Sequence, residues 1–243
     1  MTTVITFGIF SVIPLIFGAA LGAFLSVKEK YLGAISAFGA GALVAALTFG
    51  LMEESFKLGG LDNSIIGFIA GGVIFVVGDT LIIRIGGRGH RRSYDVESST
   101  TGWGIVLGAI LDGIPESIAL GIALLLNKSV GLLVFVAIIL ANLPEAISSA
   151  YDLKRTKKSN KEIILIWTAV AAISLVFVIL GYTIFSQISS SWTATFQSFA
   201  AGAILAMLAV TMMPEAYKES GIDASMATVL GFLIIFVLSK VGV

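Results

Sequence analysis

The sequence predicts an all-α polytopic membrane protein with eight transmembrane helices in a single domain, residues 1–243. Hydrophobic residues make up 57% of the chain and charged residues 12%, whereas charged residues are about a quarter of a soluble domain. Mean hydropathy is +1.03. Apolar runs recur at roughly the 20 residues that a membrane-spanning helix needs. Short connections between these runs indicate one compact bundle in a lipid bilayer.

The expected spans follow one another along the whole chain. The first run comes after Met1-Thr2-Thr3, which carries no basic residue, so we expect a retained helix rather than a cleaved signal sequence. Two hydrophilic connections, 86–101 and 152–161, are expected to be cytoplasmic loops. The predicted spans are about 4–26, 33–56, 63–85, 102–126, 130–151, 162–186, 194–217 and 224–242.

Basic residues predict the orientation of the bundle. The connections after the first, third and fifth spans hold eleven of the 15 Lys and Arg residues, and the other four are assigned to the opposite side: Lys57, Lys128, Lys218 and Lys240. Cytoplasmic loops carry the excess of Lys and Arg. We therefore expect a multi-pass protein of the cell membrane with both termini extracytoplasmic.

Composition also excludes several classes of partner and chemistry. The chain has 15 basic and 15 acidic residues, so it lacks the positive excess that nucleic-acid binding uses. It has no Cys, which excludes disulfides, thiolate metal sites and thiol catalysis.

An internal repeat relates the second span to the seventh. Residues 38–57 (FGAGALVAALTFGLMEESFK) align without a gap onto residues 199–218 (FAAGAILAMLAVTMMPEAYK), with nine of twenty positions identical and Glu54 opposite Glu215. With eight spans the two copies run in opposite directions. Helices one to three are thus expected to mirror helices six to eight around a central pair, an arrangement common in alternating-access carriers.

The fourth and fifth spans each carry a Pro-Glu pair, Pro115-Glu116 and Pro144-Glu145. A carboxylate at membrane depth is costly unless it is paired or protonated. No Lys or Arg lies in the core of either span, so a bound cation or protons must compensate. Each proline also leaves the carbonyl four residues before it without its helical hydrogen bond, and that carbonyl is then free to accept from water or an ion.

Two further side chains share the helix faces of these glutamates. Asp112 is four residues before Glu116, and Asn142 is three residues before Glu145, spacings that place each pair on one face. The predicted metal ligands are therefore Asp112, Glu116, Asn142 and Glu145. The alternative is that the prolines only kink the helices and the glutamates are protonated and hydrogen-bonded.

These residues resemble the ZIP (zinc/iron-regulated-like) divalent-metal transporters, whose bacterial members carry His-Asn-x-Pro-Glu in the fourth helix and a related Pro-Glu pattern in the fifth. The resemblance covers essentially the whole chain and implies a fold of eight spans with metal ligands on helices four and five. Carried over by position, the family's His, Asn and Glu fall on Asp112, Gly113 and Glu116, and its fifth-helix positions fall on Ala141, Asn142 and Glu145.

The site departs from that family pattern because it lacks histidine. The only histidine, His90, lies in the connection 86–101 among arginines, where we expect it to be solvated. Imidazole suits zinc, whereas carboxylate and carbonyl oxygens suit harder ions such as manganese. The departure weakens zinc as the substrate, favours manganese or ferrous iron, and leaves open a member that has lost metal transport.

Three other carboxylates are candidates for the transport pathway or its entrances: Glu54, Asp79 and Glu215. The alternative for Glu54 and Glu215 is that they are interfacial side chains. For Asp79, which lies deeper in apolar sequence, a hydrogen bond to a neighbour and a proton relay both stay open.

Two other functional classes compete with metal transport. An intramembrane protease would need a Ser–His pair, an HExxH motif or paired aspartates; the chain has no HExxH and no His within a span, so no enzyme is expected. A proton-coupled carrier of another small solute is the main alternative. We predict a divalent-metal permease that takes zinc, manganese or iron as its substrate, works by alternating access and holds no permanently bound cofactor; a homodimer stays open.

Overall fold

The computed structural model describes residues 1–25, 27–84 and 102–241, and within these ranges the chain is helical with short connections and no strand. The predicted loop 86–101, with His90, lies outside the described residues. The elements are α1 (Thr2–Phe24), α2 (Glu29–Ala46), η1 (Leu47–Met52), α3 (Glu53–Arg84), α5 (Gly102–Leu126), α6 (Lys128–Arg155), α7 (Asn160–Phe185), α8 (Ser190–Met207), η2 (Leu208–Met212), α9 (Met213–Ser220) and α10 (Ile222–Val241); η1 and η2 are π-helical.

Seven helical stretches in the described residues are long and apolar enough to cross a membrane, and one of them is Glu29–Arg84, 56 residues long. This stretch contains the second and third predicted spans. At 1.5 Å per residue it would measure about 84 Å if straight, more than twice the apolar thickness of a bilayer. Gly60 interrupts it with φ 76° and ψ −175°, a conformation open essentially to glycine alone. Eight crossings therefore stay a prediction, with this turn as the point that would separate two of them.

The second predicted cytoplasmic loop, 152–161, is shorter than expected. Helix α6 continues to Arg155 and α7 begins at Asn160. Ser159 caps α7: its hydroxyl accepts from the Glu162 amide, and the Glu162 carboxylate accepts from the Ser159 amide. Hydropathy marks where lipid contact ends, but backbone hydrogen bonds extend a helix past that point. In the extended part of α6, the Lys154 ammonium donates to the carbonyl of Ala23 at the end of α1.

The structure confirms the internal repeat. Helices α8 and η2 begin 161 residues after α2 and η1, so both copies change from α- to π-helix at equivalent positions. Gly221, with φ 59°, likewise lies 161 residues after Gly60. A π-helical segment is rare and often found at functional sites, so its recurrence at the same offset is strong support for the repeat.

The two copies run in opposite directions. At the start of α2, Lys30 pairs with Asp223 at the start of α10, with 2.8 Å between Nζ and Oδ2. Beyond the other end of η1, the Asn63 amide nitrogen lies 2.9 Å from the Ser191 hydroxyl at the start of α8. We call the first end of the bundle the Lys30 face and the second the Glu54 face.

Glycines allow the repeated helices to pack closely across this symmetry. A Cβ at Gly71 of α3 or Gly202 of α8 would meet the backbone carbonyl of the opposite helix, and the same holds for Gly41 of α2 and Gly231 of α10. The repeat thus forms two tight pairs, α3 with α8 and α2 with α10. Small residues permit such close approach where lipid gives no hydrophobic drive between helices.

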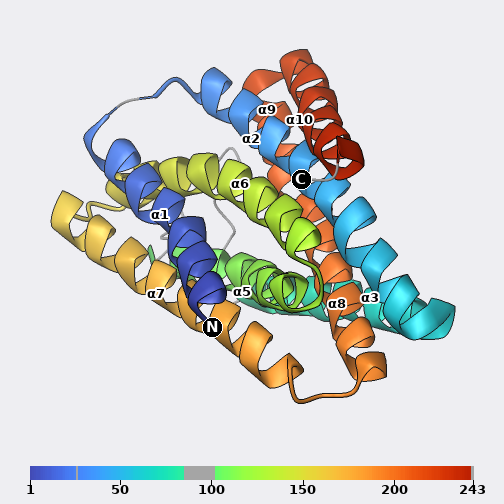
Figure 1. The fold of residues 1–243 in the computed structure, drawn as a ribbon. Helices are drawn as coiled ribbons and strands as arrows, with labels where there is room; N and C mark the ends of the chain where they lie inside the picture. Colours follow the sequence, from blue (N-terminus) through green and yellow to red (C-terminus); the bar gives the residue numbers. More distant parts are fainter. Residues whose placement is uncertain (26, 85–101, 242–243) are drawn as a thin grey trace.

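Helices α5 and α6 lie in the middle of the bundle, with α1 and α7 on one side and the two glycine-packed pairs on the other (Figure 1). One apolar cluster joins α5 and α6 to α1 and α7, and another joins them to α2, η1 and α8. The central pair is therefore shared by two packed groups of helices.

One basic residue changes sides relative to the sequence prediction. A Cβ at Gly33, near the start of α2, would touch Glu219 and Ala216 of α9, so α9 lies at the Lys30 face. Lys218, also in α9, therefore belongs with the larger basic set and not with the opposite four. The predicted imbalance of basic residues becomes greater, and the orientation of the bundle stays a prediction.

Candidate metal site

The two Pro-Glu pairs lie inside continuous helices. Helix α5 runs through Pro115 and α6 runs through Pro144. Because both helices are packed on two sides, the missing proline hydrogen bond does not end either of them. The glutamate after each proline is thus held by a central helix of the bundle.

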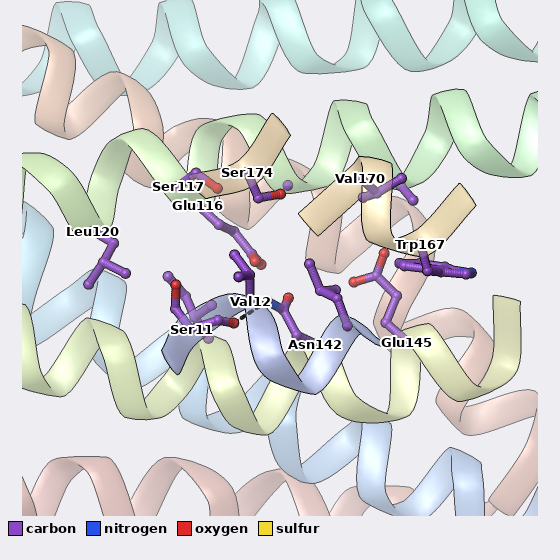
Figure 2. Close-up of a pocket in the computed structure, with 14 residues that line it drawn as sticks. Ser11, Val12, Glu116, Ser117, Leu120, Asn142, Glu145, Trp167, Val170 and Ser174 are labelled. Carbon is purple, nitrogen blue, oxygen red and sulfur yellow. Dashed lines mark hydrogen bonds between the residues drawn. The ribbon is translucent and has the colours of Figure 1, made fainter. Parts of the chain in front are cut away.

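A small cavity lies between these helices, and we call it the central cavity. Glu116, Asn142 and Glu145 contribute to its wall, and Figure 2 shows them converging from α5 and α6. Its volume is about 10 Å³, close to the space for one water molecule. Ser11, Val12, Leu15, Ala109, Gly113, Ser117, Leu120, Ile138, Trp167, Val170 and Ser174 complete the lining.

Two of the polar groups in this cavity, those of Glu116 and Asn142, are buried. Glu116 is 3% exposed and Asn142 7%. Among the described residues the Oε1 atom of Glu116 has no hydrogen-bond partner. The Asn142 amide nitrogen donates to the carbonyl of Ser11 in α1 at 3.4 Å (Figure 2), and the amide oxygen stays a candidate ligand atom. An oxygen buried without a partner is costly, and a cation bound here would remove that cost.

A second cavity, of about 20 Å³, extends from the central helices toward the Lys30 face, and we call it the Lys30-side cavity. Glu145 contributes to the walls of both cavities. Glu215, predicted as a pathway residue, lines the Lys30-side cavity together with Ser36, Asp112, Ser148, Met207, Thr211, Met212 and Glu219.

The structure divides the four predicted ligands between the two cavities. Glu116, Asn142 and Glu145 line the central one, whereas Asp112 lines the other with Glu145. Asp112 and Glu116 share a face of α5, but four residues separate them by about 6 Å along the axis. Within the described residues no three Asp, Glu, His or Cys side chains are close enough to hold a metal by themselves. A site in this conformation would combine carboxylates with amide or hydroxyl oxygens.

The remaining predicted pathway residues lie elsewhere. Glu54 lines a cavity of about 170 Å³ at the Glu54 face, where its Oε1 accepts from Asn127 at 3.3 Å and lies 3.7 Å from the Lys57 ammonium. Asp79 is 3% exposed in α3 and lines none of these three cavities.

Several lining residues were missed from the sequence. Ser11, Ser117 and Ser174 bring hydroxyl groups to the central cavity, and their only signal was a small polar residue within an apolar run. Glu219 lies one helical turn after Glu215 and lines the same cavity, so its spacing could have identified it.

These features define a multi-pass membrane protein with oxygen-bearing polar side chains around a small cavity at its two central helices. The sequence matches the family model described as ZIP Zinc transporter over residues 87–239, which is more than half of the chain. The chain belongs to the ZIP zinc transporter family, whose members are transporters of divalent metals. Comparison with curated proteins gives no match.

Proposed function

We propose that this protein carries a divalent metal cation of the zinc, iron or manganese class across the cell membrane and holds it between α5 and α6. The observation that carries the proposal is that Glu116 and Glu145, from different helices, line one buried cavity of about 10 Å³. No Lys or Arg is among the described residues that line it. A divalent cation would offset the cost of holding two carboxylates at membrane depth in a cavity that no described Lys or Arg lines.

The chemistry of the ligands supports a harder metal ion. The side chains offered are carboxylates, an amide and hydroxyls, all with oxygen donors. Oxygen ligands suit manganese, and imidazole suits zinc. We therefore propose that manganese or ferrous iron is carried in preference to zinc.

Two features support alternating access. The inverted repeat supplies two groups of helices that can exchange roles, and the Lys30-side cavity brings Glu145 together with Glu215 and Glu219 toward the Lys30 face. We propose that the cation passes from Glu145 along Asp112, Glu215 and Glu219 to the cytoplasm. With the basic Lys30 face inside, both termini are extracytoplasmic and Glu54 lies at the outer entrance.

The second candidate is a proton-coupled carrier of another small solute. A buried Glu116 oxygen without a partner is also compatible with a protonated carboxyl group that releases its proton during transport. In that case carboxylate loss would remove the pH dependence of transport and leave substrate binding intact.

A thermal-shift series separates the two candidates. Purified protein is titrated with manganese, ferrous iron and zinc, beside Glu116→Gln/Glu145→Gln and the control Glu29→Gln/Asp62→Asn, which removes two exposed charges outside the cavities. At 100 times the Kd, a bound ion stabilises the folded state by about 2.7 kcal/mol. We expect that shift in wild type and control and its loss in the double variant. A pH-dependent shift without any metal effect would overturn the proposal.

A further inference from the structure

Gln197 of α8 is a buried amide without a partner. Its side chain is 0% exposed, and neither Nε2 nor Oε1 forms a hydrogen bond within the described part of the chain. Its helical neighbours differ: the Ser198 hydroxyl donates to the carbonyl of Ala194, and that of Thr193 to the carbonyl of Ser189. A buried donor and acceptor left unsatisfied destabilise the conformation that contains them. The burial of the Gln197 amide without a hydrogen-bond partner therefore needs an explanation, whereas the burial of its neighbours does not.

The repeat gives Gln197 an equivalent residue. The 161-residue offset that relates η1 to η2 and Gly60 to Gly221 places Ser36 of α2 opposite Gln197. Ser36 lines the Lys30-side cavity. Gln197 thus occupies, in the inverted copy, the position of a residue that lines a cavity leading to one face.

The same 161-residue offset relates other residues of the Lys30-side cavity to residues of the first copy of the repeat. Met207, Thr211, Met212 and Glu215 all line the Lys30-side cavity, and their equivalents are Ala46, Gly50, Leu51 and Glu54. Ala46 is 2% exposed and Leu51 1%, and Gly50 is buried. Glu54 lines the separate cavity at the Glu54 face. Around Ala46, Gly50 and Leu51 the half that mirrors the Lys30-side cavity is therefore filled in this conformation, and Gln197 is buried as well.

We propose that Gln197 lines the pathway between the central cavity and the Glu54 face when that half is open, and that its amide there hydrogen-bonds the hydrated cation or its water. This inference rests on the proposed function, since it takes the metal cation as the transported substrate. The unsatisfied amide disfavours the present conformation and so favours opening on the Glu54 side. Gln197 thus shifts the equilibrium between the two conformations, and in the open one its amide is a polar group of the pathway wall.

Labelling at single cysteines tests this, because the chain has no native Cys. Ala46→Cys places a thiol in the filled half, and a membrane-impermeant thiol reagent is applied at the Glu54 face of intact vesicles. We expect Ala46→Cys to react. Adding Gln197→Met, of similar shape but without the amide, should lower the labelling rate about five- to 30-fold, the change that one unsatisfied group gives a two-state equilibrium.

Two variants control for packing and for loss of a glutamine. Gln197→Asn keeps an amide and should retain labelling at Ala46→Cys. Gln187→Met changes the exposed glutamine of the α7–α8 connection and should leave the rate unchanged. Ser36→Cys, labelled from the Lys30 face, should react at least as fast in the Gln197→Met background as in the wild-type background.

The proposal is overturned if Ala46→Cys never reacts, or if Gln197→Met leaves its rate unchanged. It is also overturned if Gln197→Met lowers labelling on both faces together with thermal stability, which would make Gln197 a packing residue. Failure of the proposed function is a separate result: manganese, iron and zinc would then fail to stabilise the protein, while the effect of Gln197→Met on labelling would persist and support the pathway role.

Discussion

Glu116 and Glu145 follow the prolines of two different helices and line the same cavity, but only Glu145 also lines the cavity that leads toward the Lys30 face. The two carboxylates are therefore not equivalent in this conformation. Glu116 is buried at the central cavity. Glu145 lies where a cation would leave the central cavity toward the Lys30 face. This difference gives distinct expectations for the residues around them.

Replacing Glu145 by Ala should abolish uptake while the protein still folds. The variant removes the proposed ligand that lines both cavities, and neither cavity is lined by a described Lys or Arg. Metal uptake by cells or vesicles measures the effect, with Glu29→Ala, at an exposed position, as the control. Normal metal uptake by Glu145→Ala would contradict the assignment of the metal site.

Asp112→Asn should reduce transport more than binding. Asp112 lines the Lys30-side cavity and not the central one, so the metal-induced thermal shift should persist while uptake falls by about 10- to 100-fold, the range found when supporting groups of metal sites are changed. A thermal shift lost to the same degree as in Glu116→Gln/Glu145→Gln would instead place Asp112 in the binding shell.

Gly71→Ala should destabilise the bundle and Gly72→Ala should not. A Cβ at Gly71 would collide with the backbone carbonyl of Phe199, whereas at Gly72 its nearest neighbour is the Gly202 carbonyl oxygen at 3.6 Å. Overpacking costs about 1–3 kcal/mol, while Ala in a helix gains about 0.5–1 kcal/mol over Gly. Thermal unfolding in detergent measures both; equal midpoints would contradict the close packing of α3 on α8.

Gly60→Ala should destabilise the protein for a different reason. A Cβ at Gly60 meets nothing within 4 Å, so packing is unaffected, but the positive φ of 76° costs a non-glycine residue about 1–3 kcal/mol. The midpoint of thermal unfolding should fall relative to Gly72→Ala. An unchanged midpoint would mean that the turn is not required for the second and third predicted spans.

The orientation can be tested with two cysteine variants at exposed lysines. Lys57→Cys lies at the Glu54 face and Lys28→Cys near the Lys30 face. If both termini are extracytoplasmic, an impermeant reagent labels Lys57→Cys in intact cells and labels Lys28→Cys only after the membrane is opened. The reverse pattern would invert the proposed direction of the pathway.

Much of the fold follows from local signals. Apolar runs predicted the helices, and the Phe38–Lys57 repeat predicted an inverted symmetry that the structure extends from Glu29 to Gly60 and from Ser190 to Gly221. The misplaced helix ends at 152–161 arose because hydropathy reports contact with lipid and not backbone hydrogen bonding. Within Glu29–Arg84, the interruption between the second and third predicted spans depends on one backbone conformation at Gly60, which an average of hydropathy does not register.

The sequence by itself determined the membrane class, the central pair of helices and the candidate ligands, because hydropathy, proline positions and the spacing of carboxylates are properties of neighbouring residues. Only the tertiary structure decided that Asp112 lines a different cavity from Glu116, that Glu145 lines both, and that Gln197 is buried without a partner. These facts depend on which helices meet and at what depth. Packing between distant segments fixes that depth, and no local pattern in the chain encodes it.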